Sequence, residues 1–174
     1  MQRLGGSIRV YRKRAAIATA LSLLNMSTSS ACAAFSTSTP TTNYIDKLAL
    51  VLVENRKQLV VRSQGKQVFF TPGGKREPGE TDEQALVREC QEELTIDLIP
   101  STIQPYGVFS AQAFGKSPGI KVRMTCYTAQ YRGQLTPNEE IEELRWITST
   151  CPHEDLTVMG VMLLEDLQKK GLID

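Results

Sequence analysis

A glycine-rich turn followed by an acidic helix, at residues 73–96, constrains the fold of this chain more than any other segment. Thr81 is a favourable N-cap, and Gln84 three residues later completes a capping box, so we expect a helix over residues 82–94. The Pro-Gly-Gly run at 72–74 interrupts regular structure just before it. The spacing of the apolar residues predicts that the buried side of this helix consists of Leu86, Val87, Cys90 and Leu94.

Four carboxylates crowd this loop and helix. Glu80 precedes the helix, and spacings of three and four residues place Glu89, Glu92 and Glu93 on one helical face. Such a cluster repels itself unless a cation compensates it, and hard carboxylate oxygens suit Mg²⁺ or Mn²⁺. Arg88 is spaced to pair with Glu92 and, across the start of the helix, with Glu80. An isolated run of this kind is more often a solvated helix face, so the carboxylates alone do not define a site.

The segment as a whole resembles the signature of the Nudix hydrolase superfamily, G-x5-E-x7-R-E-U-x-E-E-x-G-U, in which U is a bulky apolar residue. The sequence departs from it at two positions. Cys90 is smaller than the usual bulky residue but still apolar, and Thr95 replaces a glycine, which puts the turn after the helix in question. The run Pro72-Gly73-Gly74-Lys75 extends the similarity toward MutT-type nucleotide pyrophosphatases. The matching positions are Gly74, Glu80, Arg88, Glu89, Cys90, Glu92, Glu93 and Ile96.

The resemblance implies a Mg²⁺-dependent hydrolase, with Mn²⁺ as a substitute, that cleaves the diphosphate linkage of a nucleoside diphosphate bound to another group. It assigns the metal to Glu89, Glu92 and Glu93, with the Gly73 carbonyl as a further ligand. Arg88, Glu89 and Glu92 are the catalytic residues that it implies, with one glutamate as general base. These roles suit the chemistry, because a divalent cation neutralises phosphate charge and activates water.

The resemblance also implies which residues hold the motif together and which meet the substrate. Gly74, Glu80 and Arg88 are expected to maintain the loop–helix geometry, while Gly74, Lys75 and Phe70 are expected to contact the substrate. A fourth metal ligand, or the general base itself, is also sought in a later acidic segment that holds Glu139, Glu140, Glu142 and Glu143.

Substrate identity is less constrained than the reaction. The proline typical of ADP-ribose enzymes, the tyrosine of diadenosine polyphosphate enzymes and the coenzyme A signature are all missing. By elimination, we expect a nucleoside or deoxynucleoside triphosphate, oxidised forms included, that is cleaved to a monophosphate and pyrophosphate. Two alternatives remain open, a nucleotide conjugate such as ADP-ribose, NADH or FAD, and a Nudix-like module that binds a nucleotide without turnover. The complete set of motif carboxylates argues against the second.

The remainder of the domain alternates short apolar strands with polar turns, and a closing helix is expected over residues 156–170 with Gly171 as its stop. The resemblance implies the α/β class, as a Nudix-type α/β/α sandwich with a mixed sheet, the catalytic loop-helix and a closing C-terminal helix. We expect strands at residues 48–53, 58–62, 67–70, 103–113, 121–131 and 143–147.

Charge divides the chain into two parts. Residues 1–45 hold five basic residues and no acidic one, whereas residues 46–174 hold 15 basic and 19 acidic residues. A basic, hydroxyl-rich, acid-free leader is typical of organelle transit peptides, so residues 1–45 are predicted to direct the protein to a mitochondrion or plastid. Two alternatives stay open, a secretory signal cleaved near Ala31-Cys32-Ala33 and initiation at Met26 that leaves the protein in the cytoplasm. Residues 46–174 are predicted to form the hydrolase domain.

Several classes of function are disfavoured by composition. A net charge of +1 argues against a nucleic-acid-binding protein with a large basic surface. The longest strongly apolar run, Ala15 to Leu24, is too short to span a bilayer as a helix, so no stable membrane association is expected. Four cysteines form no CxxC pair and suggest neither a zinc site nor a disulfide scaffold. A small nucleotide is therefore the expected partner, and both a monomer and a homodimer are compatible with the sequence.

Overall fold

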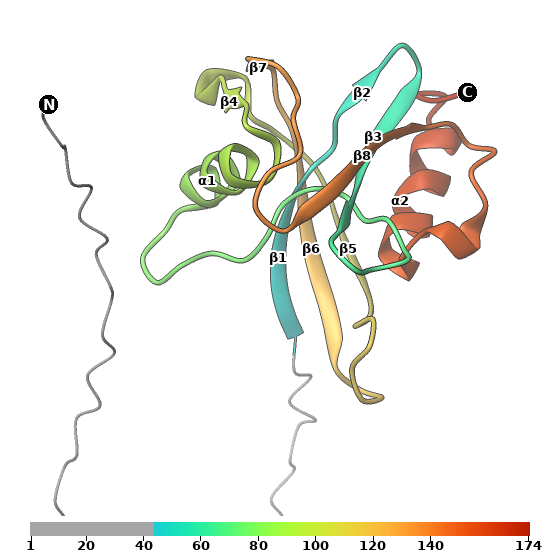
Figure 1. Ribbon diagram of the computed structural model, residues 1–174. Coiled ribbons are helices and arrows are strands. Elements are labelled where there is room, and N and C mark those ends of the chain that lie inside the picture. Colours follow the sequence, from blue (N-terminus) through green and yellow to red (C-terminus); the bar gives the residue numbers. More distant parts are fainter. Residues whose placement is uncertain (1–43) are drawn as a thin grey trace, which may run out of the picture. The chain divides into compact units, whose positions relative to one another are not determined.

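The computed structural model describes residues 44–174 of the chain. Helix α1 (Asp82–Leu94) lies on one side of the strands and helix α2 (Val158–Lys169) on the other, as Figure 1 shows. This is the α/β architecture, with a mixed sheet and a closing C-terminal helix, that the sequence predicts. The predicted leader lies outside the described residues except for its last two positions, and its targeting role stays a prediction.

A three-stranded mixed sheet forms the centre of the domain. Its strand order is β1–β6–β5, in which β1 (Tyr44–Leu50) runs parallel to β6 (Lys121–Thr128) and β5 (Gln104–Gln112) runs antiparallel to β6. Only one edge of β1 pairs with β6. Its other edge is therefore available to the loop that precedes α1, and this places the catalytic motif beside the sheet.

A second sheet packs next to the first. It is antiparallel, with β3 (Lys57–Ser63) between β2 (Val53–Glu54) and β8 (Ile141–Ile147). The short strands β4 (Asp97–Leu98) and β7 (Tyr131–Arg132) form a separate pair beyond the end of α1. The segment after β3 thus leads directly toward the catalytic loop, and the segment before β8 returns past the end of α1.

Two apolar layers fill the space between the strands and the helices. Strand β1 serves both layers, because alternate residues of a strand point to opposite faces. Leu48 and Leu50 are buried in the layer that includes Leu86 of α1, whereas Ala49 is buried in the layer that includes Leu163 of α2. Both helices are therefore fixed by burial against the same strand, and α1 holds its acidic face at the edge of the sheet.

Helix α1 begins and ends where local sequence signals place it. The Thr81 hydroxyl accepts from the Gln84 N–H, and the Gln84 side chain accepts from the Thr81 N–H, which confirms the capping box. The helix covers Asp82–Leu94, as predicted. Thr95 then adopts the left-handed conformation, with φ of 57°, and its N–H donates to the Gln91 carbonyl. The turn that a glycine would favour is thus formed by threonine, so the departure from the signature leaves its geometry intact.

The predicted strands differ from the observed ones in four places. The run 67–70 was expected to be a strand but forms only two isolated bridges, of Phe70 with Val61 and of Phe69 with Leu156. It cannot extend further, because the chain must turn immediately into the glycine loop. The predicted strand 48–53 is observed as β1 and β2 with a break between them, and the strand 121–131 divides into β6 and β7. Strand β4 was not predicted.

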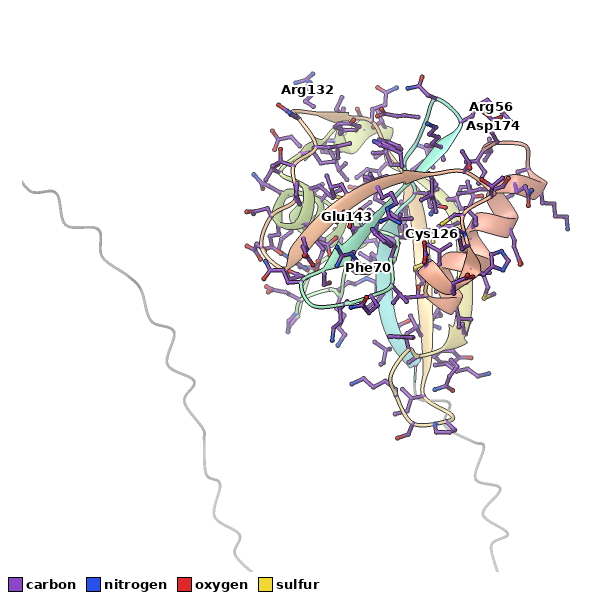
Figure 2. All side chains as sticks on the ribbon, turned by 45° about the vertical axis from the view of Figure 1, so that its right-hand side comes forward. Arg56, Phe70, Cys126, Arg132, Glu143 and Asp174 are labelled. Carbon is purple, nitrogen blue, oxygen red and sulfur yellow. The ribbon has the colours of Figure 1, made fainter. Side chains whose placement is uncertain are left out.

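The C-terminal segment packs against the turn between β2 and β3. Arg56 in that turn forms an ion pair with Asp174 and donates to the carbonyls of Gly171 and Ile173, and Figure 2 shows Arg56 beside Asp174. Gly171, with φ of +66°, ends the closing helix as the sequence predicts. None of the helices in residues 44–174 combines the length and apolarity required to span a bilayer.

Candidate active site

The glycine loop is fastened to the free edge of β1. The Leu50 N–H donates to the Pro72 carbonyl at 2.9 Å, and the Leu48 N–H donates to the Gly74 carbonyl at 2.8 Å. Gly73 between them has φ of +127°, and a Cβ at this position would lie 2.4 Å from the Leu48 carbonyl oxygen. Only glycine fits such an approach. Among the described residues the Gly73 carbonyl accepts no hydrogen bond, unlike its two neighbours, so it is free to bind a ligand.

The same loop lies directly on two carboxylates of α1. A Cβ at Gly74 would lie 2.2 Å from the carboxylate of Glu89, and the Gly73 N–H donates to Oε2 of Glu93 at 2.7 Å. Glu93 is only 2% exposed, and this burial raises its pKa to about 8, with a further contribution from the charge of Glu89. The hydrogen bond from Gly73 opposes the shift but does not cancel it. A buried carboxylate of this kind requires either a proton or a nearby cation.

Arg88 organises the other carboxylates of the motif. Its Nε and Nη2 donate to the two oxygens of Glu80, each at 2.8 Å, and its Nη1 donates to Glu89 at 3.0 Å and to Glu92 at 3.1 Å. Nη2 also donates to the Lys75 carbonyl at 3.0 Å, which ties the loop to the helix. The hydrogen bonds from Arg88 lower the pKa of Glu80 to about 2, and they raise the pKa of Arg88 itself. Both ion pairs expected from the sequence spacing are therefore present.

The arrangement fits a hard divalent cation, although it is not a closed metal cage. In residues 44–174 no three acidic, histidine or cysteine side chains already surround a common point, because Arg88 draws Glu89 and Glu92 onto its guanidinium group. The available donors are carboxylate oxygens and the free Gly73 carbonyl, which Mg²⁺ and Mn²⁺ prefer. A cation would also compensate the buried charge of Glu93. The ligand set Glu89, Glu92, Glu93 and Gly73 stays a prediction.

A cleft of about 800 Å³ opens beside these groups. Glu89, Glu93 and the Gly73–Gly74 backbone line it, as do Lys75 and Phe70, the latter labelled in Figure 2. The three residues expected to contact the substrate thus share one cavity with three of the four expected metal ligands, Gly73, Glu89 and Glu93. Glu80, Arg88 and Glu92 are not among the lining residues and are joined to one another through the Arg88 guanidinium group. The remaining walls come from β1, the segment after β3, β6, the β5–β6 loop and the first turn of α2, and their apolar residues include Ile45, Val68, Val122, Met124, Phe114 and Met159.

Four lysines from separate segments of the chain line the cleft. Lys47, Lys66, Lys75 and Lys116 all line it, and within the described part of the chain none of them forms an ion pair. Unpaired ammonium groups around one cavity suit a polyanionic ligand. Sequence reasoning singled out only Lys75, because the other three are brought together by folding and carry no local signal.

The later acidic segment contributes one carboxylate to the cleft. Glu140 lines it together with Glu93, and its charge adds to the raised pKa of Glu93. Glu142 and Glu143 are instead paired with Arg62, each at 2.8 Å, and Figure 2 shows Glu143 on β8. The sequence alone does not distinguish which glutamate of this segment could serve as metal ligand or general base. In the structure only Glu140 of the four lines the cleft.

Comparison with known protein families matches residues 46–158 to the NUDIX domain. The match covers more than half of the chain and includes the loop, α1, the glutamates of the cleft and the start of α2. The chain therefore belongs to the Nudix family. Its NUDIX domain and its MutT-type structural neighbours identify it as a Nudix hydrolase.

Solved structures share the fold at low sequence identity. A MutT Nudix hydrolase from Burkholderia pseudomallei is 22% identical with a TM-score of 0.60, over 71% of this chain and 97% of that chain. The E. coli dihydroneopterin triphosphate pyrophosphohydrolase is 17% identical with a TM-score of 0.57, over 72% and 95%. A bifunctional NMN adenylyltransferase/ADP ribose pyrophosphatase from Francisella tularensis, complexed with AMP and a Mn ion, is 16% identical with a TM-score of 0.55, over 75% and 43%. No curated protein matches the chain.

Proposed function

We propose that this Nudix hydrolase is a Mg²⁺-dependent pyrophosphatase that converts a nucleoside or deoxynucleoside triphosphate, oxidised forms included, to a monophosphate and pyrophosphate. One observation carries the proposal. Buried Glu93, Glu89 and the Gly73–Gly74 backbone form one wall of a cleft that four unpaired lysines also line. The cleft volume of about 800 Å³ lies within the usual range for small-molecule sites.

The charge of the cleft favours a triphosphate over a less charged conjugate. Of the similar structures, one is a dihydroneopterin triphosphate pyrophosphohydrolase and another includes an ADP ribose pyrophosphatase, so the shared fold accommodates both classes. A triphosphate carries more negative charge than the diphosphate bridge of ADP-ribose. Four lysines from separate segments provide more compensation than a bridging diphosphate requires, and this supports the triphosphate.

The residues of the chain divide the chemistry among them. When bound, Mg²⁺ neutralises phosphate charge and makes water more acidic. Lys75 and Lys47 are placed to orient phosphate oxygens along the cleft. Arg88 keeps Glu89 and Glu92 in a fixed arrangement, so its contribution is to hold ligands rather than to transfer a proton. The general base is assigned to a carboxylate that lines the cleft, Glu89 or Glu140, since Glu92 does not line it and accepts a hydrogen bond from Arg88.

A hydrolysis panel with product identification tests the proposal. The full chain is incubated with Mg²⁺ and with nucleoside triphosphates, ADP-ribose, NADH or FAD, beside Glu92→Gln and Glu93→Gln variants. Pyrophosphate from a triphosphate is the expected product, and both variants are expected to lose most of the activity. Gln91→Ala is a matched control on the same helix, because the Gln91 side chain makes no hydrogen bond in the described structure and is expected to be dispensable.

Other outcomes of the panel would overturn the proposal. Turnover restricted to ADP-ribose, NADH or FAD, with two monophosphate products, would establish the conjugate alternative. Tight nucleotide binding without turnover would establish a binding module. Wild-type activity in both glutamine variants would refute the metal assignment.

We also propose that residues 1–45 form an organelle-targeting leader. The proposal is supported by composition alone, since this segment holds five basic residues and no acidic one. Expression of the full chain with a fluorescent C-terminal tag, followed by N-terminal sequencing of the recovered protein, tests it. Mitochondrial or plastid fluorescence with a start no later than Tyr44 is expected, because Tyr44 and Ile45 already pair with β6 as the first residues of β1. A mature protein that begins at Met1 would refute cleavage, and secretion or a start at Met26 would support the alternatives.

A further inference from the structure

The acidic segment at residues 138–143, which leads into β8, is held by two sets of hydrogen bonds. The first set joins it to the C-terminal end of α1. The Asn138 N–H donates to the Glu93 carbonyl at 3.1 Å, and its side-chain Nδ2 donates to the Glu92 carbonyl at 3.0 Å. The last carbonyls of a helix have no partner within the helix. Asn138 supplies partners for two of them, and they belong to the residues whose side chains are the predicted metal ligands.

The second set of hydrogen bonds comes from Gln64, in the turn after β3. The Gln64 N–H donates to the Glu140 carbonyl at 2.8 Å, and its side-chain Nε2 donates to the Glu139 carbonyl at 3.0 Å. Glu139 has φ of +49°, a conformation that costs about 1 kcal/mol or more for a residue with a side chain. The two bonds from Gln64 hold the backbone in this bend, which redirects the chain between Asn138 and β8.

Ion pairs then determine which carboxylate faces the cleft. Arg62, at the end of β3, binds Glu142 and Glu143 and also donates to the Lys66 carbonyl at 3.0 Å. Glu140 has no ion-pair partner in residues 44–174 and lines the cleft. Gln64 in the turn after β3 thus holds the backbone of the segment, and Arg62 at the end of β3 holds the side chains of Glu142 and Glu143.

We infer that Asn138 and Gln64 are positioning residues that hold Glu140 at the cleft, opposite the motif glutamates of α1. The inference rests on the proposed function, because it gives Glu140 a part in metal binding or in proton transfer. It adds two residues that lie outside the motif and touch neither metal nor substrate. Catalysis depends on such placement, since a displacement of about 1 Å is worth up to about 100-fold in rate.

A double-mutant cycle separates this role from a purely structural one. Asn138→Ala and Gln64→Ala are made in the wild-type chain and again in a Glu140→Gln background. The readouts are kcat and KM with the best triphosphate, and the affinity for Mn²⁺ alone by calorimetry. Because Asn138 and Gln64 are exposed, both variants are expected to fold, and the melting temperature of each is measured alongside.

We expect each single variant to lower kcat or Mn²⁺ affinity about tenfold, with KM changed less than about twofold. In the Glu140→Gln background neither substitution should lower these values further, because residues that act through one group are not additive. Gln91→Ala, an exposed amide at the same end of α1, is expected to change nothing.

Three results would overturn the inference. The first is an undiminished loss from Asn138→Ala in the Glu140→Gln background, which would assign Asn138 to helix stability alone. The second is wild-type kcat and Mn²⁺ affinity in both alanine variants. The third is a Glu140→Gln variant that matches the wild type in both readouts. Failure of the proposed function is distinguishable, because a protein that turns over no triphosphate can still be tested through its Mn²⁺ affinity.

Discussion

Replacement of Glu93 by glutamine should change how the stability of the metal-free protein depends on pH. The Glu93 side chain is 2% exposed, and burial raises its pKa to about 8 from 4.5 in an unfolded chain. The folded state therefore holds a proton that the unfolded state releases, and the free energy of unfolding falls as pH rises between these two values. The separation of the two pKa values corresponds to a free energy of unfolding that is about 5 kcal/mol lower at pH 8 than at pH 4.

Glutamine removes this dependence, because it does not ionise and its carbonyl can still accept from the Gly73 N–H. Urea unfolding of both proteins with EDTA at pH 5, 6.5 and 8 measures the effect. The two proteins should be similar at pH 5, and the variant should be several kcal/mol more stable at pH 8. Added Mn²⁺ should reduce this difference by stabilising the wild type.

The control is Glu165→Gln, which replaces an exposed glutamate on α2 and should keep the wild-type pH dependence. A difference between wild type and Glu93→Gln that stays constant from pH 5 to pH 8 would refute the reasoning. It would mean that Glu93 is solvated or already compensated in the metal-free protein.

Three further substitutions test the geometry of the loop and helix. Gly73→Ala places a Cβ 2.4 Å from the Leu48 carbonyl oxygen. In urea unfolding the variant should lose about 2 kcal/mol or more of its free energy of unfolding, and it should also lose hydrolysis. A stable, active variant would contradict the close approach. Thr95→Gly relieves the left-handed conformation and should raise the free energy of unfolding by about 1 kcal/mol, whereas a destabilised variant would show that the threonine hydroxyl contributes more. Arg88→Lys cannot keep the two-pronged bond to Glu80 and should lower kcat at least about tenfold in steady-state assays, and unchanged kcat would contradict its organising role.

The parts of the fold that the sequence predicts correctly depend on local signals. Helix α1 covers the predicted residues because Thr81 and Gln84 form the capping box with their own neighbours. The run 67–70 has an apolar pattern that suits a strand, but a ladder needs a partner along its length, and only single bridges are available there. Strand β4 has two residues, too few to produce a recognisable pattern, and it exists because β7 lies beside it.

The same distinction applies to the candidate site. The motif fixes the positions of Gly73, Glu89 and Glu93 relative to one another, because loop and helix are adjacent in the sequence. The position of Glu140 depends instead on hydrogen bonds between parts of the chain that are distant in sequence. Asn138 bonds to the end of α1, and Gln64 in the turn after β3 bonds to the backbone of Glu139 and Glu140. Lys116, in the β5–β6 loop, joins the cleft because the start of β6 pairs with the start of β1, where Tyr44 lies opposite Lys121. No local pattern carries that information.

The proposed activity of this chain is hydrolysis of nucleoside triphosphates to pyrophosphate with a divalent cation held by the motif glutamates. Its most direct test is phosphorus NMR of the products formed by the full chain from a panel of triphosphates in ¹⁸O-labelled water, with Mg²⁺ and again with EDTA. We expect pyrophosphate and a nucleoside monophosphate, one of them labelled, with Mg²⁺ only, and little of either product from Glu93→Gln. Orthophosphate and a nucleoside diphosphate as products, or equal turnover in EDTA, would contradict it.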